Sequence, residues 1–153
     1  MARRWKPNID YSEITLLNLL LFVWQLPQNL IAILICAIVY RVPGDWENKR
    51  AGITVMMVPV KTTFCWSLGQ FVFINPMSDR NTIRHETGHC IQSIFFGPLY
   101  LLLVGLPSVI LFAIKRLKRR FSGMKEDELT KWYHSKYPEN WADKLGCIDE
   151  YDD

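Results

Sequence analysis

Two long apolar runs stand out against the polar remainder of the chain. The first covers residues 14–40, carries no charge and holds Pro27 near its middle. As one helix it would be ~40 Å long, more than the ~30 Å hydrocarbon core of a bilayer. It predicts a membrane-inserted segment, either one helix kinked at Pro27 or a helical hairpin that turns at 25–29. A pair of buried helices in a soluble core is the alternative.

The second apolar run, residues 99–114, is short for one membrane span. Gly105, Pro107 and Ser108 interrupt it, and five basic residues follow within 115–120. This pattern favours a shallow re-entrant hairpin with its turn at 105–108. The basic cluster Lys115–Arg120 is expected to stay on the cytoplasmic side and to contact anionic lipid headgroups, with an ordinary solvated helix end as the alternative.

The residues between and after these runs predict a small sheet and several helices. Short β-branched and aromatic stretches within 53–75 indicate three strands of a small antiparallel sheet. A helix is expected over 79–96, capped by Asp79 or Asn81 and stopped by Gly97 and Pro98. Residues 121–148 have a soluble character, with a short helix from Pro138 to Gly146. The sequence therefore predicts one mainly helical, membrane-associated α+β domain over residues 1–153.

Composition narrows the classes of function. Of the 153 residues, 50% are hydrophobic and 22% are charged, which excludes a disordered protein. Residues 121–153 hold nine acidic residues against four lysines, and no basic stripe interleaved with aromatic residues appears elsewhere. We therefore predict a membrane lipid partner and no nucleic acid. The four cysteines show no CxxC spacing, so we expect them to be reduced.

The sequence His85-Glu86-Thr87-Gly88-His89 carries the clearest chemistry. Two histidines four residues apart lie one turn apart on one helix face and can bind one Zn²⁺. A glutamate directly after the first histidine can reach the water that the metal activates and act as general base. The alternative is a pair of solvated histidines without a metal.

A catalytic zinc needs a third protein ligand, which the helix itself does not offer. The candidates are His134, the third histidine of the chain, or a carboxylate. Glu139 and Asp143 lie four residues apart, so on one helix Glu139 could bind the metal while Asp143 accepts the free N–H of a histidine ligand. A solvated pair of acidic residues is the alternative.

The combination of HExGH with Glu-x-x-Ala-Asp resembles gluzincin-type zinc metallopeptidases. Within them it is similar to the membrane endopeptidases that include the CAAX prenyl protease and the HtpX-type heat-shock proteases. The resemblance implies His85, His89 and Glu139 as zinc ligands, Glu86 as general base and Asp143 as an outer-shell residue. It also implies a minimal zincin-like core with a cytoplasm-facing site. The chain is much shorter than those proteins and its second apolar run is too short for two spans, so a small separate zincin family is equally compatible.

These observations predict a membrane-associated zinc metallopeptidase with a peptide or protein substrate. Glu139 and His85 must lie on the same side, so the run at 99–114 must cross the membrane twice or not at all. Tyr133, His134 and Tyr137 are candidates for stabilising the oxyanion. Two rival functions remain: a lipid-handling hydrolase, and a non-enzymatic membrane adaptor whose metal is structural, with Cys90 and Cys147 as ligands, or absent. The sequence predicts no particular oligomeric state.

Overall fold

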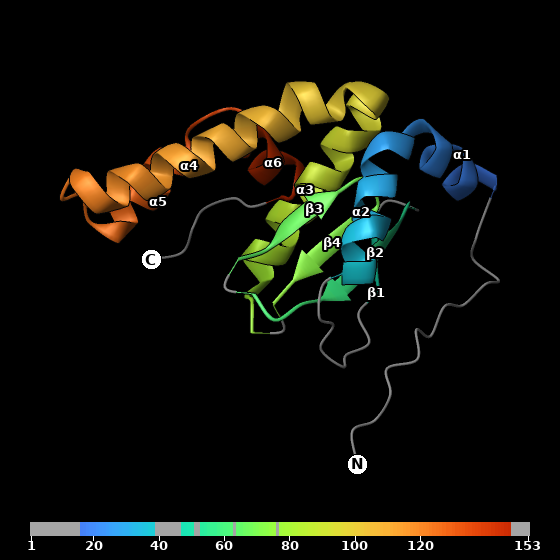
Figure 1. The fold of residues 1–153 in the computed structure, drawn as a ribbon, viewed down its shortest axis with the longest axis horizontal. Coiled ribbons are helices and arrows are strands. Elements are labelled where there is room, and N and C mark those ends of the chain that lie inside the picture. The colour runs from blue at the N-terminus through green and yellow to red at the C-terminus, as the bar shows by residue number, and fades with distance from the viewer. Residues whose placement is uncertain (1–15, 39–46, 51–52, 63, 76, 148–153) are drawn as a thin grey trace, which may run out of the picture.

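The computed structural model describes residues 16–38, 47–50, 53–62, 64–75 and 77–147, and within them the chain has an α+β fold (Figure 1). The elements in chain order are α1 (Leu16–Trp24), α2 (Leu26–Ile38), β1 (Glu47–Arg50), β2 (Ile53–Pro59), β3 (Trp66–Leu68), β4 (Phe71–Ile74), α3 (Arg80–Phe96), the short helices η2 (Gly97–Leu99) and η3 (Leu101–Gly105), α4 (Leu106–Phe121), α5 (Glu126–His134) and α6 (Glu139–Leu145). The prediction of a mainly helical α+β fold is confirmed.

The sheet is mixed, so the prediction of an antiparallel sheet was wrong. Its strand order is β1-β2-β4-β3, with β2 and β4 parallel and the two outer pairs antiparallel. All four residues of β4 are buried, which favours a central position covered on both faces. The chain therefore passes from β2 to the edge strand β3 and turns back to place β4 between them. β1 lies before the stretch 53–75 in which the sequence predicted strands.

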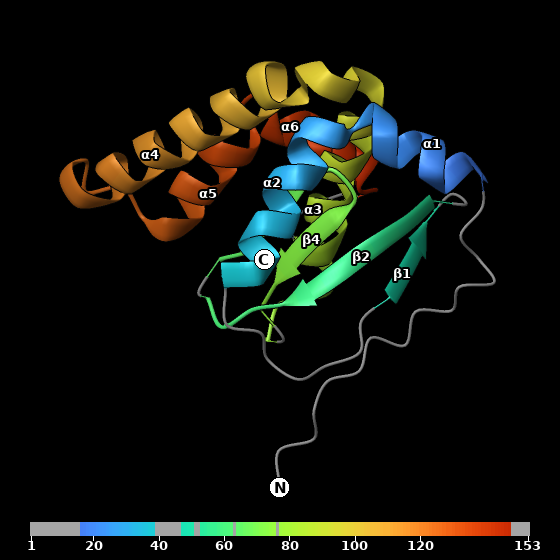
Figure 2. The same ribbon diagram turned by 45° about the vertical axis from the view of Figure 1, so that its right-hand side comes forward.

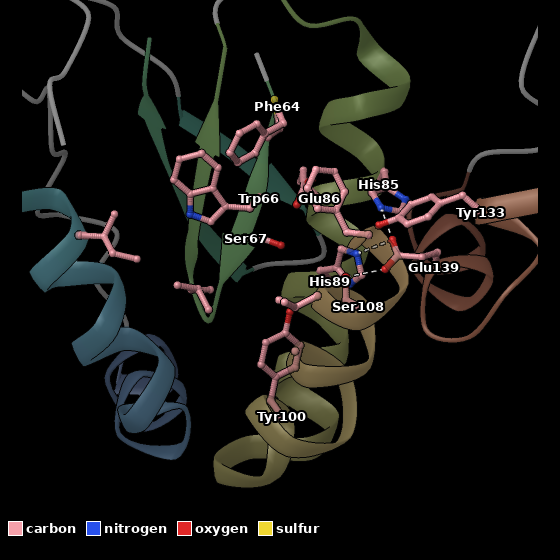
Figure 3. A pocket seen from close by; sticks show the side chains of 16 residues that line it. Phe64, Trp66, Ser67, His85, Glu86, His89, Tyr100, Ser108, Tyr133 and Glu139 are labelled. Carbon is pink, nitrogen blue, oxygen red and sulfur yellow. Dashed lines mark hydrogen bonds and ion pairs between the residues drawn. The ribbon is translucent and has the colours of Figure 1, made fainter. Parts of the chain in front are cut away.

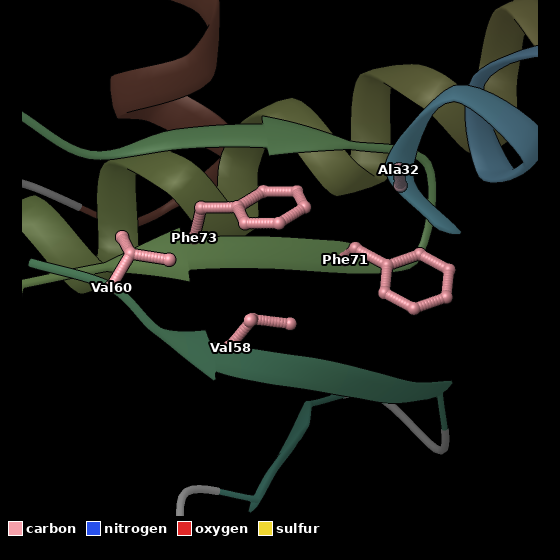
Figure 4. Packing of buried hydrophobic residues seen from close by; sticks show 5 residues of the cluster. All are labelled: Ala32, Val58, Val60, Phe71 and Phe73. Carbon is pink, nitrogen blue, oxygen red and sulfur yellow. The ribbon is translucent and has the colours of Figure 1, made fainter. Parts of the chain in front are cut away.

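Helices cover both faces of this sheet (Figures 1 and 2). On one face, Ala32 of α2 packs against Val58 and Val60 and against Phe71 and Phe73 of β4 (Figure 4). The other face forms a second buried cluster whose members are Val55, Met57, Val72, Ile74 and, from α3, Cys90. Alternate side chains of β4 thus point into two different clusters, Phe71 and Phe73 into the first and Val72 and Ile74 into the second. The second cluster holds α3 against the sheet.

The first apolar run forms two helices that meet at a bend of 91°. The bend falls at Gln25, and Pro27 occupies the first turn of α2, where its missing N–H is tolerated. Within the described part of the chain, no single helix is long and apolar enough to cross a membrane, whereas α1 and α2 taken together meet that test by length and composition.

The second apolar run does not turn at 105–108 as predicted. A π-helical turn, η3, passes into α4, and Gly105 keeps helical dihedral angles of −59° and −50°. Pro107 sits in the first turn of α4, which explains why it does not break the helix. The chain reverses later, at residues 122–125, and α5 packs back along α4 toward α3 (Figure 2). This return places Glu139 beside His85 without the predicted hairpin.

Candidate metal centre and its cavity

Helix α3 presents both motif histidines to one point. Asp79 caps the helix as predicted, because its Oδ1 accepts a hydrogen bond from the backbone N–H of Thr82 at 2.7 Å. His85 and His89 are buried, with exposed fractions of 8% and 6%. Their rings lie 4.7 Å apart between centroids, edge to face. The i, i+4 spacing therefore produces the paired imidazoles that the sequence predicted.

Helix α6 brings Glu139 to the same point. Its Oε2 lies 3.0 Å from Nε2 of His85 and 3.2 Å from Nε2 of His89 (Figure 3). The carboxylate is completely buried. Of the two options for a third ligand, the structure places Glu139 at the ε nitrogens of both histidines, and His134 on the far side of Asp143.

Two glycines allow α6 to lie close to α3. A Cβ built on Gly88 would lie 2.0 Å from the backbone oxygen of Ala142, and one built on Gly146 would lie 2.4 Å from the backbone oxygen of Arg84. Any side chain at either position would push the helices apart. Gly88 of HExGH therefore sets the distance from the histidines to Glu139.

The ring nitrogens that face away from Glu139 are held by other side chains. Nδ1 of His85 lies 2.6 Å from Oδ1 of Asp143, as the sequence predicted for an outer-shell carboxylate. Nδ1 of His89 lies 2.8 Å from Oε1 of Gln92, whose amide nitrogen donates to the backbone oxygen of Pro138. With acceptors at both Nδ1 atoms, neutral rings carry their hydrogen there and leave Nε2 free to bind a metal.

Ser108 orients the remaining oxygen of Glu139. Its hydroxyl donates a 2.6 Å hydrogen bond to Oε1, the oxygen that does not face the histidines. Ser108 comes from the first turn of α4, inside the apolar run. Glu139 therefore presents a single oxygen, Oε2, to the two rings.

The site is strongly polarised in the absence of a metal. Burial opposes protonation of His85, but the hydrogen bonds to Asp143 and Glu139 outweigh it and raise the pKa of His85 to about 10. Burial also opposes ionisation of Glu139 and Asp143, and their histidine partners overcome it, so the pKa of each carboxyl is far below its usual range. The hydrogen bonds among these groups therefore favour ionised carboxylates beside a protonated His85.

A cavity of about 340 Å³ opens beside these side chains. Glu86 lines it together with both histidines and Glu139 (Figure 3). Oε2 of Glu86 is buried and has no hydrogen-bond partner among the described residues. A buried carboxylate oxygen without a partner is costly, and a polar group or water held in the cavity would satisfy it.

The three candidates for an oxyanion donor are separated by the structure. Tyr133 lines the cavity, and burial and the nearby charge of Glu139 raise the pKa of its hydroxyl, which therefore remains a donor. His134 is hydrogen-bonded through Nδ1 to Oδ2 of Asp143 at 3.0 Å and does not line the cavity. Tyr137 is about half exposed and donates to the backbone oxygen of Leu103. Of the three candidates, only Tyr133 lines the cavity.

Two groups of side chains have a spacing that suits a metal, and they share His85. One is His85, His89 and Glu139; the other is His85, His134 and Asp143. In the second group both oxygens of Asp143 already accept hydrogen bonds from the δ nitrogens of the two histidines. We therefore assign the second group to orienting the first.

The first group fits a zinc ion by donor type and by spacing. Ligand atoms around a tetrahedral zinc with bonds of ~2.0–2.1 Å lie ~3.3 Å apart, close to the 3.0 and 3.2 Å observed here. Neither cysteine proposed for a structural site joins it. Cys90 is in the core against the sheet, and Sγ of exposed Cys147 lies 4.0 Å from the backbone oxygen of Leu145.

Sequence reasoning missed the contributions of Gln92 and Ser108. Gln92 was on the same face of the helix as the histidines, three residues after His89, and that spacing was the available signal. Ser108 had no local signal, because its partner is 31 residues away and the serine stood out only as an interruption of the apolar run.

A scan against protein-family models, a search of curated proteins and a search of solved structures each returned no significant match.

Proposed function

We propose that this protein is a zinc-dependent hydrolase that cleaves peptide bonds. The observation that carries the proposal is the convergence of His85, His89 and Glu139 beside a cavity that Glu86 also lines. Oε2 of Glu86 has no hydrogen-bond partner among the described residues. The sheet, the HExxH helix and the helix that carries ExxxD would then form a minimal zincin-like core.

The roles of the side chains follow from their positions. A zinc ion held by His85, His89 and Glu139 would polarise a substrate carbonyl and lower the pKa of water toward ~7. Glu86 removes a proton from the water whose oxygen attacks the carbonyl carbon. The same carboxyl then protonates the departing amine nitrogen as the C–N bond breaks, which returns Glu86 to its ionised form.

The edge strand β3 supports a peptide as the substrate. All three residues of β3, Trp66, Ser67 and Leu68, line the cavity, although successive side chains of a strand point to opposite faces. The cavity must therefore run along the edge of the strand, where its backbone lies. β3 pairs with β4 on its other side, and no other described strand pairs with it. An extended peptide can add to such an edge through main-chain hydrogen bonds, which a lipid ester cannot form.

Tyr133 completes the proposed chemistry. Its hydroxyl remains protonated beside Glu139, so it can donate to the oxygen that becomes negative when water adds to the carbonyl. This role distinguishes Tyr133 from His134 and Tyr137, the other two residues that the sequence offered.

A single substitution tests the enzyme proposal. Glu86→Gln should keep stoichiometric zinc and lose hydrolysis of a fluorescence-quenched peptide library by ~10²-fold or more, because the base is removed while the ligands remain. Glu128→Gln is the matched control, since it makes the same change at an exposed carboxylate of α5. His85→Ala should lose both zinc and hydrolysis.

The alternative is a non-enzymatic protein with a structural metal. It predicts that Glu86→Gln is silent in every function while zinc removal unfolds the chain. Purified protein that takes up no zinc would contradict both the enzyme and the structural metal, and would leave only the adaptor without a metal. The open cavity and the three ligands, rather than four, favour the enzyme.

A further inference from the structure

The helices α1 and α2 bury polar side chains and expose apolar ones, which is the reverse of helices that pack on a protein core. The buried residues of the pair include Gln25, Gln28 and Asn29, which are completely covered. Large apolar side chains point outward instead. Those at least one-third exposed are Leu16, Leu17, Leu19, Leu20, Val23 and Trp24 on α1, and Leu26, Leu30, Ile31, Ile33, Leu34 and Ile38 on α2.

The buried amides attach this pair to the rest of the molecule. Nε2 of Gln28 donates to Oγ of Ser93 and to the backbone oxygen of Gly97, both at 2.9 Å. Oδ1 of Asn29 accepts from the backbone N–H of Gln70 at 2.9 Å. The outward apolar face is therefore fixed by specific hydrogen bonds and cannot be turned inward by rotating the helices.

The exposed apolar face is too wide for the stripe that a single partner helix covers. At 100° per residue, the outward residues of α1 and those of α2 each span about 160° of the helix circumference. A soluble helix shows the opposite pattern, with its apolar stripe toward the core. Exposed apolar surface of this extent marks contact with a membrane or another protein.

A second apolar face continues from the first. Trp24 donates through Nε1 to the backbone oxygen of Ile94, and its ring lies against Gly97, so the bend of the α1–α2 pair adjoins η2. Beyond it, Leu102 and Leu106 are at least half exposed. In both ribbon views α1, η3 and the start of α4 lie along the same upper edge of the molecule (Figures 1 and 2).

The charge beside the apolar face distinguishes a membrane from a second copy of this chain as its partner. The apolar part of α4 ends in Lys115, Arg116, Lys118, Arg119 and Arg120, while Val109, Ile110, Ile114 and Leu117 on the same helix are exposed. An apolar face followed directly by a basic cluster complements acyl chains bordered by anionic headgroups. A second copy of this chain would bring the same positive charge against itself.

We propose that α1, α2 and the η3–α4 segment insert into one leaflet of an anionic membrane without crossing it. At 1.5 Å per residue, nine-residue α1 and thirteen-residue α2 are ~14 and ~20 Å long, each shorter than the ~30 Å hydrocarbon core. The 91° bend lets one helix enter the leaflet while the other lies along it.

Flotation of the full-length protein with vesicles tests this surface. Wild type should float with phosphatidylcholine vesicles, and more fully when phosphatidylglycerol is added. Leu20→Glu combined with Leu34→Glu should lower the bound fraction about tenfold or more, because charge replaces outward-facing leucines. Met77→Glu is the control, since Met77 is 91% exposed and lies outside these helices. Arg116→Glu with Arg120→Glu should abolish only the gain from phosphatidylglycerol.

A second measurement works even if the leucine variant does not fold. Brominated lipids placed in the outer leaflet should quench wild-type tryptophan fluorescence, and Trp24→Phe should lose that quenched component. The proposal is overturned if wild type stays monodisperse in water without binding vesicles. It is also overturned if the face buries a homodimer that vesicles do not displace, or if quenching requires bromines in the inner leaflet.

Discussion

Replacing Gly88 by alanine should separate the two halves of the candidate metal centre. The added Cβ would meet the backbone oxygen of Ala142 at 2.0 Å and its carbonyl carbon at 2.7 Å, whereas ordinary contacts begin at 3.4 Å. The shortfall of 1.4 Å lies against backbone, so no side-chain rotation relieves it. Helix α6 must move, and Glu139 moves with it.

The magnitude follows from how little displacement a metal site tolerates. Metal–ligand distances hold to within about 0.2 Å, so a shift approaching 1.4 Å removes Oε2 of Glu139 from the zinc. We expect zinc affinity to fall by ~100-fold or more, which exceeds the usual effect of an outer-shell change. Overpacking between α3 and α6 should also lower the free energy of unfolding of the metal-free protein by about 1–3 kcal/mol.

Competition with a zinc chelator and urea denaturation measure the two effects separately. Gly105→Ala is the matched control, because its Cβ would meet no atom closer than 3.8 Å and its backbone is already helical. That variant should bind zinc as wild type does and gain up to about 1 kcal/mol of stability. If Gly88→Ala retained wild-type zinc affinity, the close approach of α3 and α6 would not be what positions Glu139.

Four further predictions concern residues around the candidate metal centre. Ser108→Ala should weaken zinc binding by about 10–100-fold, because Oε1 of Glu139 loses the hydroxyl that donates to it. Ser122→Ala, which removes an exposed hydroxyl at the end of α4, should leave zinc binding unchanged, and equal affinities in the two variants would refute the role of Ser108. Zinc binding at pH 7 should release about one proton, because the folded-state pKa of His85 is about 10 and the ring must lose its proton to bind the metal. Calorimetry in buffers of different ionisation enthalpy measures the number of protons released, and a value of zero would contradict the prediction. In the metal-free protein, the stability that His85 contributes is fully present below its unfolded pKa of about 6.5 and is lost as pH rises through about 10. Tyr133→Phe should lower kcat by ~10²-fold with zinc content unchanged, and an unchanged kcat would remove Tyr133 from the proposed chemistry.

Local spacing was enough to predict which side chains of the candidate site share a helix face. His85 and His89 lie on one face because a helix has 3.6 residues per turn, and Glu139 and Asp143 share a face for the same reason. The orientation of each pair toward the other depends on Gly88 and on the α4–α5 return, which no local pattern records.

In the fold, too, features set by local sequence were predictable, whereas features set by packing between distant segments were not. The end of α3 at Phe96 and its cap at Asp79 follow from residue type. The position of β4 between β2 and β3 depends on two helices covering both faces of the sheet, so hydropathy of the strand alone did not determine it. Gly105 and Pro107 were misinterpreted as a turn because both are tolerated at the start of a helix.

The detour through α4 and α5 has a consequence for how the chain folds. His85 and Glu139 are separated by 54 residues, and closing a flexible loop of that length costs roughly 3–4 kcal/mol of chain entropy. A metal that joins the two residues acts as a cross-link across this loop. Because structural zinc ions in small domains contribute about 10–16 kcal/mol, the ion could offset that entropy several times over. The segment from α3 to α6 would then complete its folding when the metal arrives. Loss of the ion would loosen this segment while the sheet stays folded, which differs from the unfolding of the whole chain that a structural metal predicts.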